Sequence, residues 1–162
     1  MAIEKVKDFF AAHGLDDRVM EFSVSSATVE LAAAAIGTEG ARIAKSLTFR
    51  GADGKCVMIV TAGDTKIDNP KFKQTFGCKA KMLSADEVLA ETGHAVGGVC
   101  PFALPGEGVS VYLDQSMKRF ETVFPACGSA NSAIELSLDD LFRLSGAMEW
   151  IDVCKIPDPQ QN

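Results

Sequence analysis

The sequence lacks any apolar run that approaches the ~20 residues a helix needs to cross a membrane. It also lacks a secretion signal, because residues 1–8 mix acidic and basic side chains where such a signal would be basic and then apolar. We therefore expect a cytoplasmic protein with no membrane partner.

Metal-ligand patterns are also missing. There are only two histidines, and the five cysteines are never closer than 22 residues, so no CxxC or CxxH spacing occurs. This excludes a zinc ribbon and a thioredoxin-like motif, and it favours reduced thiols. We expect no metal and no cofactor. The residues concerned are His13, His94, Cys56, Cys78, Cys100, Cys127 and Cys154.

Positive charge is scarce overall but concentrated in one segment. The net charge of −6 argues against a protein that coats nucleic acid without specificity. Residues 66–81 nevertheless carry five lysines against the single Asp68. Such a flank is able to hold a single-stranded end by a few phosphates, and the alternative is a solvated helix face. The candidate tRNA-binding residues are Lys66, Lys71, Lys73, Lys79 and Lys81.

The length and the periodicity predict one domain over residues 1–162, with a frayed tail from about residue 156. Helices are expected at 3–13, 26–36 (capped by Ser25 or Ser26), 69–76, 84–91 and from 137. Strands are expected at 43–49, 56–60, 79–83, 109–113, 122–126, 133–136 and 149–153. These elements do not alternate strictly. They predict an α/β (α+β) fold, in which a mixed, partly closed sheet or barrel of about seven strands is flanked by helices.

A glycine-rich loop stands out at residues 93–102, where Gly97 and Gly98 precede Pro101. Glycine lets backbone approach a ligand closely, and proline fixes the exit of the loop. Successive N–H groups of such a loop are able to point at one acceptor, as in an oxyanion or phosphate cradle. An ordinary turn between strands is the alternative.

Several motifs occur in a fixed order from the second helix onward. They are Ile43-Ala44-Lys45-Ser46-Leu47-Thr48-Phe49, Thr61-Ala62-Gly63-Asp64, Ser84-Ala85-Asp86-Glu87-Val88, the glycine loop, Val111-Tyr112-Leu113-Asp114, Gly128-Ser129-Ala130-Asn131 and Ile134-Glu135-Leu136. Over residues 20–145 this order resembles the YbaK/prolyl-tRNA-synthetase-associated editing domain family. Lys45 and Gly97-x-x-x-Pro101 match the lysine and GxxxP signatures of that family.

The resemblance implies removal of wrongly attached amino acids from tRNA. An aminoacyl ester is already activated, so its hydrolysis needs a held water and a stabilised oxyanion rather than a strong nucleophile. Lys45 then anchors the phosphate or ribose of the terminal adenosine, or orients the aminoacyl group. Backbone N–H groups of Gly97, Gly98 and Val99 supply the oxyanion contacts. The family also implies that the ribose hydroxyl of the substrate helps to activate the water.

Six further residues are candidates for substrate binding: Cys100, Pro101, Phe102, Asp114, Ser129 and Asn131. Four of them have a second interpretation. Cys100 with His94 is either a nucleophile and its base or a small buried hydrophobe. Asp114 either orients a substrate amine or caps the turn before Ser116. Ser129 and Asn131 are turn formers as well as pocket candidates.

We interpret the chain as a free-standing deacylase that acts on a small amino acid attached to tRNA for proline, with prolyl-tRNA synthetase as a possible partner. Val99, Phe102 and the alanine-rich second helix are expected to form the wall that excludes proline. Two alternatives stay open: a non-catalytic tRNA-binding or regulatory module of the same fold, and a hydrolase of another small activated acyl compound.

Overall fold

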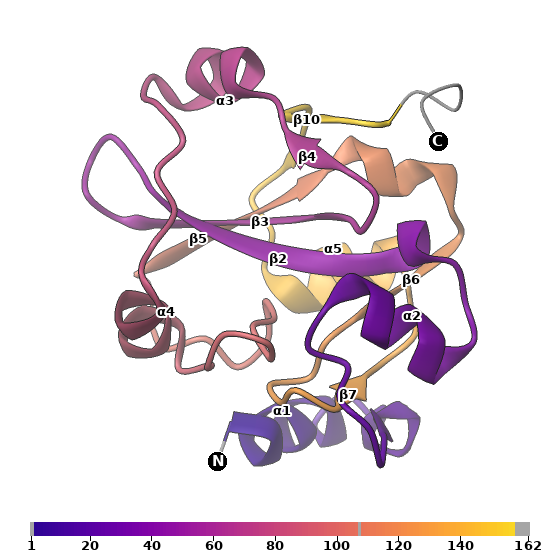
Figure 1. Ribbon diagram of the computed structural model, residues 1–162. Coiled ribbons are helices and arrows are strands. Elements are labelled where there is room, and N and C mark those ends of the chain that lie inside the picture. The colour runs from indigo at the N-terminus through magenta and orange to yellow at the C-terminus, as the bar shows by residue number, and fades with distance from the viewer. Residues whose placement is uncertain (1, 107, 158–162) are drawn as a thin grey trace.

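A curled sheet of six strands forms the centre of the computed structural model, which describes residues 2–106 and 108–157 (Figure 1). The strand order is β8-β6-β2-β3-β5-β9. The strands of this sheet are β2 (Ile43–Arg50), β3 (Cys56–Ala62), β5 (Val109–Asp114), β6 (Thr122–Pro125), β8 (Leu136–Ser137) and β9 (Trp150–Ile151). Two small antiparallel pairs lie outside it: β1 (Met20–Glu21) with β7 (Ser132–Ala133), and β4 (Lys66–Ile67) with β10 (Cys154–Lys155).

The sheet mixes parallel and antiparallel pairs, as expected. β2 and β3 form a hairpin whose register runs from Ala44 opposite Ala62 to Arg50 opposite Cys56. β5 is parallel to β3, β9 is parallel to β5, and β6 is parallel to β2. Every residue of β3 is buried, because this strand lies in the middle of the sheet with material on both faces.

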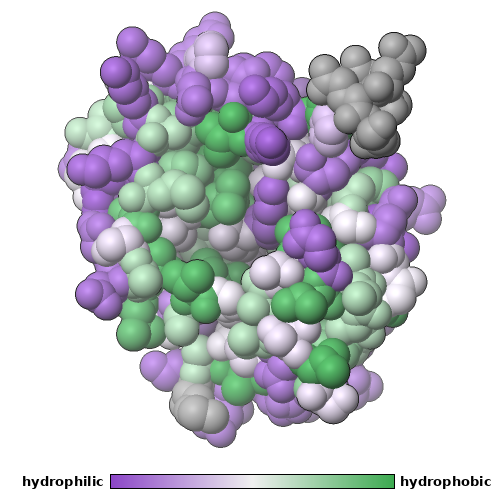
Figure 2. Space-filling model, viewed as in Figure 1, coloured by the Kyte–Doolittle hydropathy of each residue, from purple (hydrophilic) through white to green (hydrophobic). Residues whose placement is uncertain are grey.

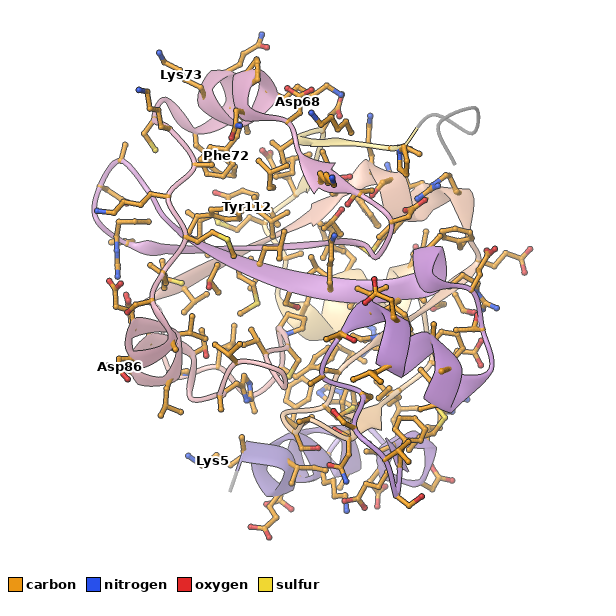
Figure 3. All side chains as sticks on the ribbon, viewed as in Figure 1. Lys5, Asp68, Phe72, Lys73, Asp86 and Tyr112 are labelled. Atoms are coloured by element: carbon orange, nitrogen blue, oxygen red, sulfur yellow. The ribbon has the colours of Figure 1, made fainter. Side chains whose placement is uncertain are left out.

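Helices pack on both faces of the sheet. Their bounds are α1 (Ala2–Ala11), α2 (Val29–Ile36), α3 (Asn69–Phe76), α4 (Ala85–Thr92) and α5 (Leu138–Ser145). Short 3₁₀ turns occur as η1 (Asp16–Arg18), η2 (Gly40–Arg42) and η3 (Gln115–Arg119). α1 and α5 contribute to the larger core on one face. α3 covers the other face, where Phe72 and Tyr112 lie close together between the helix and the sheet (Figure 3).

Local signals explain most helix ends. The predicted capping box at Ser84 and Glu87 is present, and Pro70 lies in the first turn of α3. The expected cap of α2 at Ser25 or Ser26 is wrong. Thr28 is the cap, since its hydroxyl accepts the Leu31 N–H.

Some expected strands are shorter than their sequence pattern indicates. The segment 79–83 makes only one bridge, between Met82 and Phe49. The segment expected at 133–136 is not one strand, because β7 ends at Ala133 and β8 begins at Leu136. The strand expected at 122–126 ends at Pro125, and the one expected at 149–153 is only the two residues of β9. The last four residues of the described chain include β10, which was not expected. The α+β fold class itself is confirmed. No helix in residues 2–106 and 108–157 is long and apolar enough to span a membrane.

Candidate functional site

The edge of β2 is unpaired over a short stretch in the middle of the molecule. β6 pairs with β2 only at Ile43 and Ala44, and Leu83 donates its N–H to the Thr48 carbonyl. Alternate residues of an antiparallel strand turn their N–H and C=O groups to opposite edges. Ala44 and Thr48 bond away from β3, so the N–H and C=O of Ser46 face the same side. Within the described chain no strand pairs with Ser46 there.

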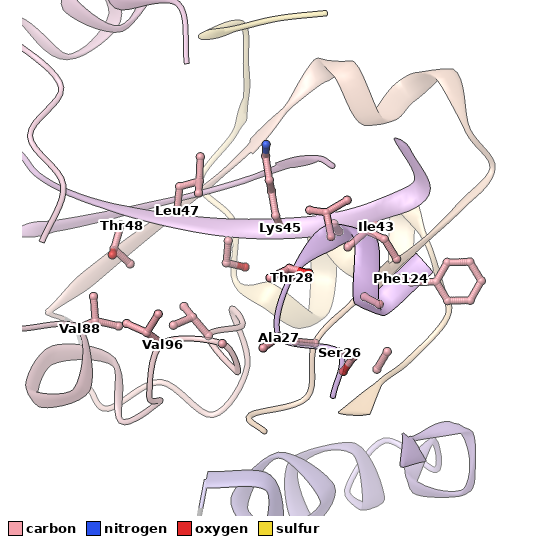
Figure 4. Close-up of a pocket in the computed structure, with 18 of the residues that line it drawn as sticks. Ser26, Ala27, Thr28, Ile43, Lys45, Leu47, Thr48, Val88, Val96 and Phe124 are labelled. Carbon is pink, nitrogen blue, oxygen red and sulfur yellow. The ribbon is translucent and has the colours of Figure 1, made fainter. Parts of the chain in front are cut away.

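A cavity of about 440 Å³ lies at this gap (Figure 4). Its walls come from β2, the start of α2, α4, the glycine loop and residues 124–133. Most of the lining side chains are small and apolar. Met82 and Val96 line the cavity although they are 60% and 65% exposed, so its rim is apolar too. Figure 2 shows this face hollowed near its centre with hydrophobic side chains around the hollow.

Two residues that line the cavity carry buried hydroxyl groups, and these groups have no hydrogen-bond partner in the described residues. They are the Oγ atoms of Ser26 and Ser46. A buried polar group left unsatisfied costs ~1–3 kcal/mol. A hydrogen bond from a ligand at either hydroxyl would offset this cost.

The glycine loop closes one side of the cavity with Gly97 and Val99. Gly97 has a φ of +98°, which glycine adopts readily. Gly98 donates its N–H to the Ala95 carbonyl over 3.0 Å, so that amide is already used inside the loop. The loop thus brings Gly97 and Val99 to the cavity, but it does not bring the Gly98 amide there.

Lys45 also lines the cavity, but its amine points away from the glycine loop. In Figure 4 the Lys45 side chain leaves the side of β2 opposite to Val88 and Val96. The amine donates to the carbonyls of Gly63, over 3.3 Å, and Thr65. Burial lowers the pKa of Lys45, while the charges of Cys154 and Asp64 act in the opposite direction.

The turn that accepts the Lys45 amine is itself anchored. Arg119 binds Asp64 with two hydrogen bonds of 2.7 and 3.0 Å. The Thr65 hydroxyl donates to the Ala62 carbonyl over 2.8 Å. These contacts hold the amine at a defined position on the edge of β2.

Cys100, Pro101 and Phe102 lie in the core rather than on the cavity wall. Phe102 packs against Phe10 with ring centroids 4.7 Å apart. His94 Nε2 donates to the Phe102 carbonyl over 2.8 Å and lies 3.5 Å from Cys100 Sγ. Burial raises the pKa of Cys100 to about 12 and lowers that of His94, so both groups are neutral near pH 7. This contradicts the interpretation of Cys100 as a nucleophile.

Asp114 has the capping role that was one of its two interpretations. Its carboxylate is buried and accepts the N–H groups of Ser116 and Val153, each over 3.0 Å. It is part of a second cavity, lined by polar residues, and does not line the cavity at Ser46.

Ser129 and Asn131 form hydrogen bonds next to the cavity but do not line it. Asn131 Nδ2 donates to the Phe22 carbonyl over 2.9 Å, and the neighbouring Ala130 carbonyl accepts the Ser26 N–H over 2.6 Å. Ser129 Oγ donates to Ser132 Oγ over 2.7 Å. Neither residue lines the cavity, but together they hold the segment that carries Ser26.

The five candidate lysines are dispersed. Lys66 lies on β4 and Lys71 on α3, where its amine binds Asp152 over 2.9 Å. Lys73, Lys79 and Lys81 are exposed, and none of the five lines the cavity at Ser46. In the described residues no group of three or more His, Cys, Asp or Glu side chains is arranged to hold a metal ion.

Sequence reasoning missed Ser26 and Ser46 as candidate site residues. Ser46 follows Lys45 directly, and the period of a strand turns the two side chains to opposite faces. Nothing in the sequence indicates that β6 stops pairing at Ala44, which is what opens the edge of β2 at Ser46.

Comparisons with known proteins relate this chain to aminoacyl-tRNA editing domains. A family model described as "Aminoacyl-tRNA editing domain" matches residues 24–144. The chain is 56% identical over 155 residues to the uncharacterized protein YwhH of Bacillus subtilis (strain 168), covering 96% of this chain and 98% of YwhH. It is 30% identical over 136 residues to the proline–tRNA ligase of Thermosipho africanus (strain TCF52B), covering 82% of this chain but only 23% of the ligase.

Solved structures show the same fold. One is described as a proposed trans-editing enzyme for prolyl tRNA synthetase, with a TM-score of 0.84, 27% identity, and coverage of 95% of this chain and 97% of that chain. Another is the hypothetical protein APE2540, with a TM-score of 0.82, 30% identity, and coverage of 93% and 99%.

Proposed function

Because the chain belongs to the family of aminoacyl-tRNA editing domains, we propose that it hydrolyses the ester bond between a small, wrongly attached amino acid and tRNA for proline. The observation that carries the proposal is the cavity at the open edge of β2, which Ser26 and Ser46 line together with the glycine loop. The hydroxyls of both serines have no partner in the described residues. An aminoacyl group has the ammonium and carbonyl functions that such hydroxyl and backbone groups bind.

The proposed reaction adds water to the ester carbonyl carbon. Oxyanion contacts come from the N–H groups of Gly97 and Val99, and one such donor is worth ~10²–10³ in rate in other hydrolases. The bond between the carbonyl carbon and the ribose oxygen then breaks, and the ribose oxygen takes up a proton that the attacking water has lost. The products are the free amino acid and uncharged tRNA.

Water activation is assigned to the substrate. Lys45 is the one ionisable residue among the described residues that line the cavity, and its amine faces away from the glycine loop. No lining carboxylate, histidine or cysteine is available as a general base. A free hydroxyl of the terminal ribose therefore orients the attacking water, and Lys45 anchors the sugar-phosphate part of the terminal adenosine.

Substrate size follows from the wall of the cavity. Val99 and Ala32 line it, so both remain candidates for the wall that excludes proline, whereas Phe102 belongs to the core. A hydrophobic pocket separates one methylene by only ~1–3 kcal/mol, so exclusion of proline must be steric. We propose alanyl, seryl or 2-aminobutyryl groups as substrates. The relation to proline–tRNA ligases and to a proposed trans-editing enzyme supports tRNA for proline, and hence action in the cytoplasm beside its synthetase.

The deciding experiment is hydrolysis of tRNA for proline charged with alanine, serine, threonine, cysteine or proline. Release of alanine or serine with prolyl-tRNA spared is the expected result. Preferential cleavage of prolyl-tRNA would end the editing proposal. Tight binding of tRNA without hydrolysis of any ester would instead favour a non-catalytic tRNA-binding module.

A further inference from the structure

A pair of lysines lies directly opposite each other on the small ribbon formed by β4 and β10. The register pairs Lys66 with Lys155 and Ile67 with Cys154. Ile67 and Cys154 pack into the core between α3 and the sheet, so the two lysines project from the other side of the ribbon, where both are exposed. Directly opposite residues on one face have Cβ atoms ~5 Å apart, and like charges there destabilise the pair.

Neither lysine of this pair has an acidic partner in the described part of the chain, although neighbouring cations do. Arg119 is neutralised by Asp64 over 2.7 Å, and Lys71 by Asp152 over 2.9 Å. Asp64 and Asp152 are thus already paired with other cations. The positive charge of Lys66 and Lys155 is left to face solvent.

A third cation extends this charge. Lys118, on η3, lines a second cavity of about 450 Å³ together with Lys155. Its amine lies 4.8 Å from the centre of the Trp150 ring, a contact that holds the side chain without neutralising it. Lys118 therefore continues the basic surface beyond the ribbon.

The other end of this surface reaches the candidate active site. The Lys45 amine donates to the carbonyl of Thr65, the residue just before Lys66. The charge of Lys66 is also close enough to contribute to the lowered pKa of Lys45. Cations thus follow one another from Lys45, which lines the cavity at Ser46, to Lys66, Lys155 and Lys118.

We propose that Lys66 and Lys155, continued by Lys118, bind phosphate groups of the single-stranded acceptor end of a tRNA whose terminal aminoacyl adenosine occupies the cavity at Ser46. The proposal rests on the proposed function for its substrate. It assigns the phosphate contacts to a pair that joins two distant parts of the sequence, instead of to the lysine-rich segment 66–81 as a whole. A polyanion removes the repulsion between the two amines, which explains why the fold tolerates them face to face.

The test compares two double variants, Lys66→Ala/Lys155→Ala and the matched control Lys5→Ala/Lys55→Ala. Lys5 and Lys55 are exposed as well, and Lys5 lies on α1, at the end of the molecule opposite to the ribbon (Figure 3). The affinity for uncharged tRNA is measured by fluorescence anisotropy at several salt concentrations. Each phosphate contact on a single strand contributes ~0.7 to the slope of log affinity against log salt.

The expected result is a slope that is shallower by about 1.4 for Lys66→Ala/Lys155→Ala and unchanged for the control. Hydrolysis of alanyl-adenosine, an ester without a phosphate chain, should stay at the level of the unmodified protein in both variants. Lys66→Arg/Lys155→Arg should keep the original slope, because it keeps both charges.

The proposal would be overturned by an unchanged slope in Lys66→Ala/Lys155→Ala, by an equal change in the control, or by a parallel loss of alanyl-adenosine hydrolysis. A change of slope in Lys73→Ala/Lys79→Ala alone would also overturn it, in favour of the segment around α3. The binding measurement uses uncharged tRNA. It therefore still tests the lysine pair if the protein hydrolyses no ester and the proposed function fails.

Discussion

A Cβ atom on Gly98 would lie 2.7 Å from the backbone nitrogen of Ser129. Real Cβ atoms do not approach backbone so closely, so the glycine loop and residues 128–129 fit together only because Gly98 has no side chain. We expect Gly98→Ala to push the loop from the cavity wall. It should lower the free energy of unfolding by ~1–3 kcal/mol and reduce deacylation.

Urea unfolding of Gly98→Ala, with Gly108→Ala as the control, checks this expectation. Gly108 has no atom within 4 Å of its ideal Cβ position and no positive φ. Equal stability of the two variants would show that the loop relaxes without cost.

Removal of the Ser46 hydroxyl should raise the stability of the free protein and lower its activity. Its Oγ is buried without a partner, so Ser46→Ala relieves an unsatisfied polar group and should stabilise the free protein by ~1 kcal/mol. The same change should lower kcat/KM for alanyl-tRNA, because the proposed ligand loses a hydrogen bond. Thermal unfolding and deacylation are measured on the same preparation, and a variant that is both less stable and fully active would contradict this role.

Lys45→Ala should lower kcat/KM about ten- to a hundred-fold without unfolding the protein, since a charge-assisted contact is worth ~1.5–3 kcal/mol. The amine donates to the carbonyls of Gly63 and Thr65, and no other acceptor is found for it in the described residues. Lys55→Ala, on the exposed turn between β2 and β3, is the matched control. Near-normal hydrolysis by Lys45→Ala would remove the residue from the site.

Thiol chemistry gives a prediction that depends on pH. Burial raises the pKa of Cys56 and Cys154 to about 11 and that of Cys100 to about 12, above the ordinary value of 9.0, and it raises the pKa of Cys127 further still. Only Cys78 is partly exposed. At pH 7.5 we expect iodoacetamide to modify Cys78 alone in the native protein, as measured by mass spectrometry, and Cys100→Ser to keep most of the activity.

The raised thiol pKa values also fix the sign of a stability change. The unfolded chain loses these protons at a lower pH than the folded chain does, so the folded state binds more protons above pH 9. Stability should be complete below pH 9 and should fall as the pH rises toward about 12. Urea midpoints that stay constant between pH 8 and 10.5 would contradict this burial effect.

Val99 should control the size of the acyl group. It lines the cavity, so Val99→Ala removes part of the wall and should increase hydrolysis of larger esters, with threonyl-tRNA as the first to gain. Val24→Ala is the control, because Val24 is 59% exposed and does not line the cavity. The panel of charged tRNAs measures the ratio of threonyl to alanyl cleavage, which should change only in Val99→Ala.

Elements with strong local signals could be predicted from the sequence. The capping box at Ser84 and the proline at the start of α3 mark helices within a residue or two of their observed starts. The hairpin of β2 and β3 follows from two apolar runs separated by a glycine-rich turn. These features depend on neighbours in the chain and not on the tertiary structure.

The remaining features depend on distant contacts. β10 exists because the chain after Val153 returns to pair with β4, and the pattern of residues 150–157 does not indicate that pairing. The sequence pattern places Phe102 on the cavity wall because it is the last residue of the glycine loop, but it packs against Phe9 and Phe10 in the core. The motif of the loop thus marks one wall of the cavity, and tertiary packing decides which of its side chains reach it.

The unpaired stretch of β2 is also too short to accept a strand from another chain. An open strand edge is a template on which another chain can add a strand, and natural proteins protect such edges. Here the free backbone groups of Ser46 lie between the pairing of Ala44 with β6 and the bond from Leu83 to Thr48. A foreign strand cannot follow an edge interrupted on both sides within a few residues, whereas a small ligand needs only that length. The same interruption that leaves backbone groups available for recognition keeps the sheet from growing.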